Sequence, residues 1–129
     1  MITACAALPR PDQDGTWITP SLLQAYVKYH RQGRAHSAEA WLDDQLVGGI
    51  YGVDSGGAFS GESMFYVAPN ASKLALLHLV DHLRSRGIDW MDIQMVTPHM
   101  KALGAVELPR ETFLARLAET RARGLRLFP

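Results

Sequence analysis

Cysteine is almost absent from this chain of 129 residues, which contains a single one, at position 5. One cysteine can form neither an internal disulfide nor a cysteine-based zinc cage, so the sequence excludes a disulfide scaffold and a zinc ribbon. An excess of either charge is lacking as well, because 13 Lys and Arg residues balance 13 Asp and Glu residues. This balance excludes a general polyanion binder, although it permits a local basic patch.

Long hydrophobic runs are also missing. No apolar stretch approaches the roughly 20 residues that cross a membrane, and the N-terminal stretch lacks the basic residues that begin a signal peptide. We therefore expect a cytoplasmic location. With 47% hydrophobic residues, the chain can still bury one sizeable core. Two prolines and an Asp-Gln-Asp-Gly run predict an irregular segment over residues 1–14, followed by a single domain over residues 15–129.

Turn and cap residues divide the rest of the chain into helices and strands. Thr19-Pro20 is a typical helix start, because threonine caps the first turn and proline needs no hydrogen-bonded N–H there. Glycines inside the second predicted strand indicate a bulge or the close approach of another group. The predicted helices cover 20–32, the stretch between Asn70 and Gly87, the stretch between Thr97 and Gly104, and 111–122, and the predicted strands cover 36–42, 46–53, 58–66 and 88–96.

This order of elements predicts an α+β fold, with a mixed, largely antiparallel sheet flanked by helices. The first three strands are joined by short turns and should form an antiparallel meander. In the last helix, the apolar spacing predicts that Phe113, Leu114 and Leu117 face inward.

Asp92 and Gln94 are the first candidates for chemistry, since they interrupt an otherwise apolar predicted strand. Strand alternation would place both on one face, roughly 6.5–7 Å apart along the strand. Burying a carboxylate and an amide is costly unless they are hydrogen-bonded. The pair can orient a reacting group, lie at a solvent-facing edge or tie down a loop, and spacing alone leaves these alternatives open.

Three other features of the sequence are weaker candidates. Glu62 is either a charged group in an apolar cleft or an outward residue on an alternating strand. Trp17 can stack on a planar ligand or cover the start of the first helix. His78 and His82 have a spacing that suits a metal, but the glutamate of a zinc-protease motif is missing after the first histidine. We therefore expect no metal and no cofactor.

A series of collinear motifs resembles the leucyl/phenylalanyl-tRNA–protein transferase family. The resemblance covers about residues 15–117, most of the chain. Its motifs are Gly15-Thr-Trp-Ile-Thr19, Ala25-Tyr26, Ala35-His-Ser37, Glu39, Trp41, Leu46-Val-Gly-Gly-Ile-Tyr-Gly-Val53, Gly61-Glu-Ser-Met-Phe65, Asn70-Ala-Ser-Lys73, Asp92-x-Gln94, Thr97-Pro-His99, Leu103-Gly-Ala105 and Pro109-Arg110.

The resemblance implies an enzyme that moves Leu or Phe from its tRNA to the N-terminal amino group of a protein, marking that protein as an N-degron for degradation. It also implies a fold similar to the GCN5-related acyltransferases. It implies that Gln94 draws a proton from the attacking amine, that Asp92 orients Gln94, and that Glu62 contacts the terminal adenosine or the amine. Because an amide is a weak base, we interpret Gln94 chiefly as a residue that orients the amine. Trp17 would be a stacking surface for the adenosine. The pocket for the transferred side chain would comprise Ile50, Phe59, Met64, Leu76, Leu79, Leu83 and Met91.

Family members carry an N-terminal domain before the point where this chain begins, with a basic surface for the tRNA. We therefore expect the catalytic C-terminal domain alone, with a separate partner as one way to replace the missing domain. One alternative is a non-catalytic or partner-dependent truncated homologue. Another is an acyltransferase that uses acetyl-CoA on a small-molecule amine. For the latter, the nearest phosphate-binding string, His30-Arg-Gln-Gly-Arg-Ala35, begins with the wrong residue and precedes the strand.

Overall fold

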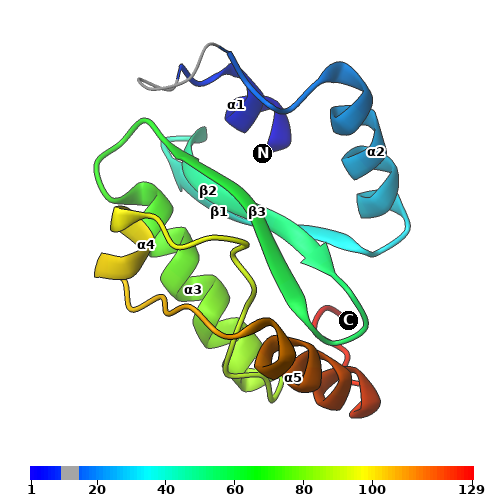
Figure 1. The fold of residues 1–129 in the computed structure, drawn as a ribbon. Helices are drawn as coiled ribbons and strands as arrows, with labels where there is room; N and C mark the ends of the chain where they lie inside the picture. The colour runs from blue at the N-terminus through cyan, green and yellow to red at the C-terminus, as the bar shows by residue number, and fades with distance from the viewer. Residues whose placement is uncertain (10–14) are drawn as a thin grey trace.

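The computed structural model describes residues 1–9 and 15–129 and confirms the α+β class (Figure 1). Its sheet has three antiparallel strands in the order β1-β2-β3, as the meander predicted. In the described part of the chain, no helix has both the length and the apolar character needed to cross a membrane. The strands are β1 (Ala35–Leu42), β2 (Gln45–Asp54) and β3 (Phe59–Tyr66), and the helices are α1 (Ile2–Ala7), α2 (Pro20–Arg31), α3 (Ala71–Ser85), α4 (Pro98–Ala102) and α5 (Arg110–Ala122).

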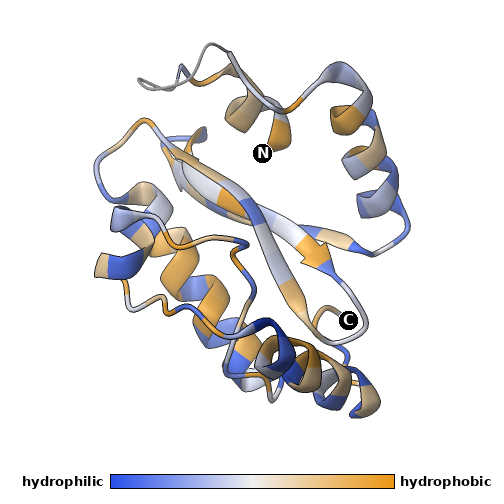
Figure 2. Ribbon diagram, viewed as in Figure 1, coloured by the Kyte–Doolittle hydropathy of each residue, from blue (hydrophilic) through white to orange (hydrophobic). Residues whose placement is uncertain are grey.

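Helices cover both faces of this small sheet (Figure 1). Helices α1 and α2 lie on one side, whereas α3, α4 and α5 lie on the other. Adjacent residues of β2 point in opposite directions, so that Ile50 belongs to the core under α3 and Tyr51 to the core under α1 and α2. Apolar residues are concentrated along α3 in Figure 2, which fits its place over the larger of these cores.

Local signals in the sequence predicted several element boundaries. Thr19 caps α2 by accepting a hydrogen bond from the Leu22 N–H at 3.3 Å, and Thr97 caps α4 by accepting one from the Met100 N–H at 3.2 Å. The glycines of β2 lie where other groups come close. A Cβ placed on Gly48 would be 2.8 Å from the backbone of Ala71 at the start of α3. Glycine at this position therefore allows α3 to approach the sheet.

The N-terminal segment differs from the prediction. We expected residues 1–14 to be irregular, but residues Ile2–Ala7 form α1, in which Cys5 is completely buried. Alanines favour a helix here, and the chain turns extended at Leu8, before Pro9. The prediction was based on the Asp-Gln-Asp-Gly run. The first three residues of this run lie outside the described residues, which resume at Gly15.

The predicted fourth strand over 88–96 is wrong. This segment pairs with β3 only as an isolated parallel bridge between Ser60 and Asp92. The ladder ends there because the Asp92 side chain binds the backbone of Gln94 and the chain turns away. The inward position predicted for Leu114 is also wrong, since its side chain is 45% exposed. Thr120 is the buried residue of α5.

Candidate functional site

Asp92 is held beside the start of β3 by its own backbone. Its N–H donates to the carbonyl of Phe59 at 3.0 Å, and its carbonyl accepts from the N–H of Gly61 at 2.8 Å. A Cβ at position 61 would be only 2.8 Å from the Met91 Cε, and glycine has no Cβ. Glycine at position 61 therefore leaves room for the end of the Met91 side chain.

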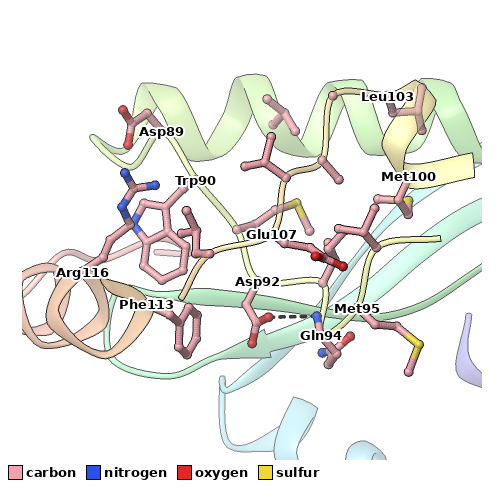
Figure 3. A pocket seen from close by; sticks show the side chains of 18 of the residues that line it. Asp89, Trp90, Asp92, Gln94, Met95, Met100, Leu103, Glu107, Phe113 and Arg116 are labelled. Atoms are coloured by element: carbon pink, nitrogen blue, oxygen red, sulfur yellow. Dashed lines mark hydrogen bonds between the residues drawn. The ribbon is translucent and has the colours of Figure 1, made fainter. Parts of the chain in front are cut away.

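The Asp92 carboxylate fixes the turn that follows it. Its Oδ1 accepts from the Gln94 backbone N–H at 2.9 Å (Figure 3). The Ser60 hydroxyl donates to its Oδ2 at 3.4 Å. Gln94 has φ 64°, a left-handed conformation that costs a residue with a Cβ about 1–2 kcal/mol. The prediction that Asp92 and Gln94 lie on one face of a regular strand is therefore wrong. The two residues are instead joined through a local turn, which agrees with the alternative that the pair ties down a loop.

Asp92 and Gln94 line a cavity of about 890 Å³. This volume falls within the roughly 300–1,000 Å³ that small-molecule sites occupy. The cavity lies between the segment around Asp92, the connection that leads to α5, and one side of α3. Its walls are largely apolar, with a few charged groups, and are formed by Leu76, Val80, Leu83, Arg84, Ile88, Asp89, Trp90, Met91, Asp92, Ile93, Gln94, Met95, Val96, Met100, Leu103, Gly104, Ala105, Val106, Glu107, Leu108, Arg110, Phe113 and Arg116.

Glu62 lies apart from this cavity lining. The register of β2 and β3 shifts between Tyr51, which pairs with Ser63, and Gly52, which pairs with Gly61, so Glu62 is the extra residue of a β-bulge. Its Oε2 accepts a hydrogen bond of 2.9 Å from the Tyr26 hydroxyl on α2. Neither interpretation from the sequence anticipated this arrangement, in which the carboxylate is half-buried and bound to a tyrosine.

Tyr26 is the residue of this arrangement that sequence reasoning did not single out. Burial, followed by its hydrogen bond to Glu62, raises the pKa of Tyr26 from 10.0 to about 12. Its ring packs edge-on against Tyr51 with centroids 5.4 Å apart. Its place in the Ala25-Tyr26 motif was the one indication of Tyr26 in the sequence. The motif does not predict the contact with Glu62, which lies 36 residues away.

The seven residues that the resemblance assigns to an apolar pocket gather in one cluster. Five of them are buried in the core under α3, and Met64 and Met91 pack against that core. Phe59 is 0% and Leu79 3% exposed, and neither lines the cavity, so part of the cluster is closed. Leu76, Leu83 and Met91 belong to the cluster and also line the cavity that contains Gln94. These three residues connect the closed cluster with the open space.

Trp17 does not line this cavity either. It lies just before α2 and is 40% exposed, with its carbonyl accepting from the Thr19 N–H at 3.0 Å. Of the two histidines with metal-like spacing, His82 is hydrogen-bonded to the Leu127 carbonyl at 2.8 Å. Within residues 1–9 and 15–129, no group of three His, Cys, Asp or Glu side chains is arranged to hold a metal ion.

Known proteins are similar to this chain over most of its length. A family profile described as leucyl/phenylalanyl-tRNA protein transferase matches residues 1–118. A protein named leucyl/phenylalanyl-tRNA--protein transferase from Anaeromyxobacter dehalogenans is 54% identical over 118 residues, which cover 92% of this chain and 51% of that protein. A protein of the same name from Magnetococcus marinus is 56% identical over 115 residues, covering 85% of this chain and 49% of that protein.

A third protein of this name, from Bordetella avium, is 50% identical over 123 residues, covering 95% of this chain and 49% of that protein. The chain thus spans about half the length of the curated relatives it matches. The match includes the residues around Asp92 and Gln94 as well as Glu62 and Tyr26. On these matches, the chain belongs to the leucyl/phenylalanyl-tRNA–protein transferase family.

Proposed function

We propose that this chain transfers an apolar amino acid, of the Leu or Phe type, from aminoacyl-tRNA to the amino group at the N-terminus of a protein. The observation that carries the proposal is the turn in which the Asp92 carboxylate fixes Gln94 at the wall of the cavity. Membership of the family and the names of the relatives support the type of reaction.

The chemistry requires placement of an amine more than a strong base. The amine nitrogen attacks the ester carbonyl carbon, a C–N bond forms, and the C–O bond to the tRNA ribose breaks. The proton lost by the amine ends on the released ribose hydroxyl, so the reaction needs no further reactant. An aminoacyl ester is already activated, and correct orientation alone can supply much of the acceleration. In our proposal Gln94 orients the amine, and Asp92 holds Gln94 in the required turn.

The transferred side chain is proposed to occupy the apolar cluster next to the cavity. It would enter beside Leu76, Leu83 and Met91, the residues that the cluster and the cavity have in common. An apolar wall favours an apolar side chain by about 25 cal/mol for each Å² that it removes from water. Ile50, Phe59, Met64 and Leu79 would form the floor.

Glu62 and Trp17 are proposed to contact the substrate from the other side of β3. Glu62 would hold the terminal adenosine or the incoming amine, with its carboxylate kept in place by Tyr26. Trp17 is sufficiently exposed to stack on a base. These assignments follow the family resemblance and are separate from the turn at Asp92.

The proposal is tested by incubating the chain with radiolabelled Leu-tRNA or Phe-tRNA and a peptide with an N-terminal Arg. We expect label that survives mild base, because an amide resists conditions that hydrolyse an ester. A chain in which Asp92 and Gln94 are both alanine should fold but lose transfer. Full activity in that double variant would contradict the site.

A second candidate, which follows the family resemblance, is a catalytic domain that acts together with a separate partner. In that case the chain alone would be inactive, and addition of a protein supplying the other half of a relative would restore transfer. Saturable binding of coenzyme A in a calorimeter, without any transfer from aminoacyl-tRNA, would instead indicate an acyltransferase of another type.

A further inference from the structure

The last residues of the chain pack into the fold, although they lie outside residues 1–118, which the family profile matches. Thr120 accepts a hydrogen bond of 3.1 Å from the Trp90 Nε1–H. Leu127 is 0% exposed and belongs to the core under α3, and Phe128 is partly buried against the same core. The C-terminal segment therefore contributes side chains to the core that contains the proposed pocket.

The Phe128 ring is held by two histidines from different elements. It stacks on His36 of β1, with ring centroids 3.9 Å apart and planes at 12°, and on His82 of α3, with centroids 5.0 Å apart and planes at 22°. The Nε2 of His36 is hydrogen-bonded to the Gly33 carbonyl at 3.0 Å. The Nε2 of His82 is hydrogen-bonded to the Leu127 carbonyl at 2.8 Å. Because a carbonyl oxygen only accepts, both Nε2 atoms carry hydrogen and donate, and these bonds fix the two rings on which Phe128 stacks.

Phe128 supports Phe59, the aromatic residue in the floor of the proposed pocket. The centroids of the two rings are 5.6 Å apart, and their planes meet at 54°. The Phe59 ring also meets the sheet, because a Cβ on Gly52 would be 2.6 Å from its Cε1 and Cζ atoms. Phe59 is 0% exposed, and neither ring lines the cavity. Since protein interiors are close-packed, the place of the Phe59 ring depends on both Gly52 and Phe128.

We propose that Phe128 is a positioning residue for the choice of amino acid, because it holds the Phe59 ring and thereby sets the depth of the pocket for the transferred side chain. This inference rests on the proposed function, in which Phe59 forms part of the pocket floor. Removing a large side chain from a core leaves a space that neighbouring groups fill only in part. Without the Phe128 ring, Phe59 can shift into that space. The floor then lies deeper, which favours a large transferred side chain over a smaller one.

Transfer kinetics with Leu-tRNA and Phe-tRNA test this role of Phe128 through a ratio. In Phe128→Ala, kcat/KM for Phe-tRNA relative to Leu-tRNA should rise about ten-fold, the lower end of the effect of one methylene in an apolar pocket. Phe128→Leu is the milder change and should raise the ratio by a smaller factor, so it serves where Phe128→Ala does not fold. Ile18→Ala is the matched control, since Ile18 is 3% exposed in the core under α1 and α2. It should lower stability as Phe128→Ala does and leave the ratio unchanged.

A second measurement needs no transfer. Phenylalanine ethyl ester and leucine ethyl ester are titrated separately into a chain labelled with ¹³C at its methionine methyl groups, and the signals of Met64 and Met91 report binding at the pocket. In Phe128→Ala, the ratio of the two dissociation constants should shift towards the phenylalanine ester by about the same ten-fold factor.

The outcomes separate the role of Phe128 from the proposed function. A wild-type ratio in the folded Phe128 variants, or esters that move neither methionine signal, would overturn the inference. A chain that transfers with an unchanged ratio retains the function and refutes the role of Phe128. A ratio of ester affinities that shifts in a chain without transfer supports the role of Phe128 and contradicts the function.

Discussion

The Asp92 carboxylate accepts the backbone N–H of Gln94 at 2.9 Å, and this bond stabilises a left-handed conformation that glutamine seldom adopts. Such a conformation persists only where neighbouring contacts determine it, and it is often found at functional sites. The contact between Asp92 and Gln94 is therefore the structural basis on which the proposed chemistry depends.

Substituting Asp92 separates positioning from charge. Asp92→Ala removes the acceptor of the Gln94 N–H and should lower kcat about 100-fold, because loss of orientation near a reacting group has effects of this size. Asp92→Asn keeps an acceptor oxygen at the same place and should retain most of the activity. Single-turnover transfer, together with circular dichroism to confirm the fold, provides the measurement. Equal losses in the two variants would show that Asp92 acts through its charge.

Two substitutions of Gln94 should differ in stability but should both abolish activity. Gln94→Gly relieves the positive φ and should be about 1 kcal/mol more stable than Gln94→Ala, in which the Cβ remains. Both variants should lose transfer, since neither has an amide to orient the amine. Urea unfolding of the two variants gives the stability difference. No difference between them would mean that the turn carries no strain.

Two glycines provide a matched pair of substitutions. An alanine Cβ at Gly48 would be 2.8 Å from the backbone of Ala71, which cannot move without displacing α3. Gly48→Ala should therefore destabilise the fold by about 1–3 kcal/mol. At Gly61 the nearest atom, also at 2.8 Å, is the Met91 Cε, the end of a flexible side chain.

Gly61→Ala should consequently keep most of the stability and instead move Met91 into the proposed pocket. We expect its KM for Phe-tRNA to rise more than its KM for Leu-tRNA, because the larger side chain loses more room. Thermal unfolding and transfer kinetics measured on both glycine variants check this. A loss of stability in Gly61→Ala equal to that of Gly48→Ala would contradict the flexibility of Met91.

Tyr26 predicts a dependence of stability on alkaline pH. Burial and the hydrogen bond to Glu62 raise its pKa to about 12, above the ordinary value of 10.0. Between these values the unfolded chain releases the phenolic proton while the folded chain keeps it, so the free energy of unfolding falls as pH rises. Below pH 10 both states are protonated, and the contribution is constant.

Urea unfolding of the wild type and Tyr26→Phe at intervals from about pH 9 to about pH 11.5 isolates this effect. The difference in stability between the two proteins should shrink above about pH 10. A difference that stays constant across this range would show that the Tyr26 pKa is not raised in the folded chain.

Local signals in the sequence predicted most of the elements, because caps and turns depend on neighbouring residues. Thr19 and Thr97 cap the helices that they were expected to begin, and the close approach of Ala71 explains Gly48. The segment over 88–96 was mispredicted for a physical reason: its apolar residues have the pattern of a strand, but the Asp92 side chain competes for the backbone.

The arrangement of the candidate site was less accessible from the sequence. The bulge at Glu62 arises from a shift in register between two strands, which no local pattern records. Its partner Tyr26 and the Trp90 partner Thr120 lie 36 and 30 residues away in the chain. The family resemblance gave the residues of the apolar cluster. Which of them form a closed floor and which an open edge depends on how α3 packs on β2.

The parallel bridge between Ser60 and Asp92 determines how quickly the amide protons near the site exchange with deuterium. In the described residues, the segment over 88–96 is joined to β3 by two backbone hydrogen bonds, whereas Ile50 is paired with strands on both sides. Amide protons at Gly61 and Asp92 can therefore exchange with deuterium after the segment detaches, without unfolding of the sheet. The Ile50 amide must wait for a larger opening. We therefore expect the contact between Asp92 and Gln94 to open locally, and we expect a substrate that bridges the segment and β3 to slow this exchange.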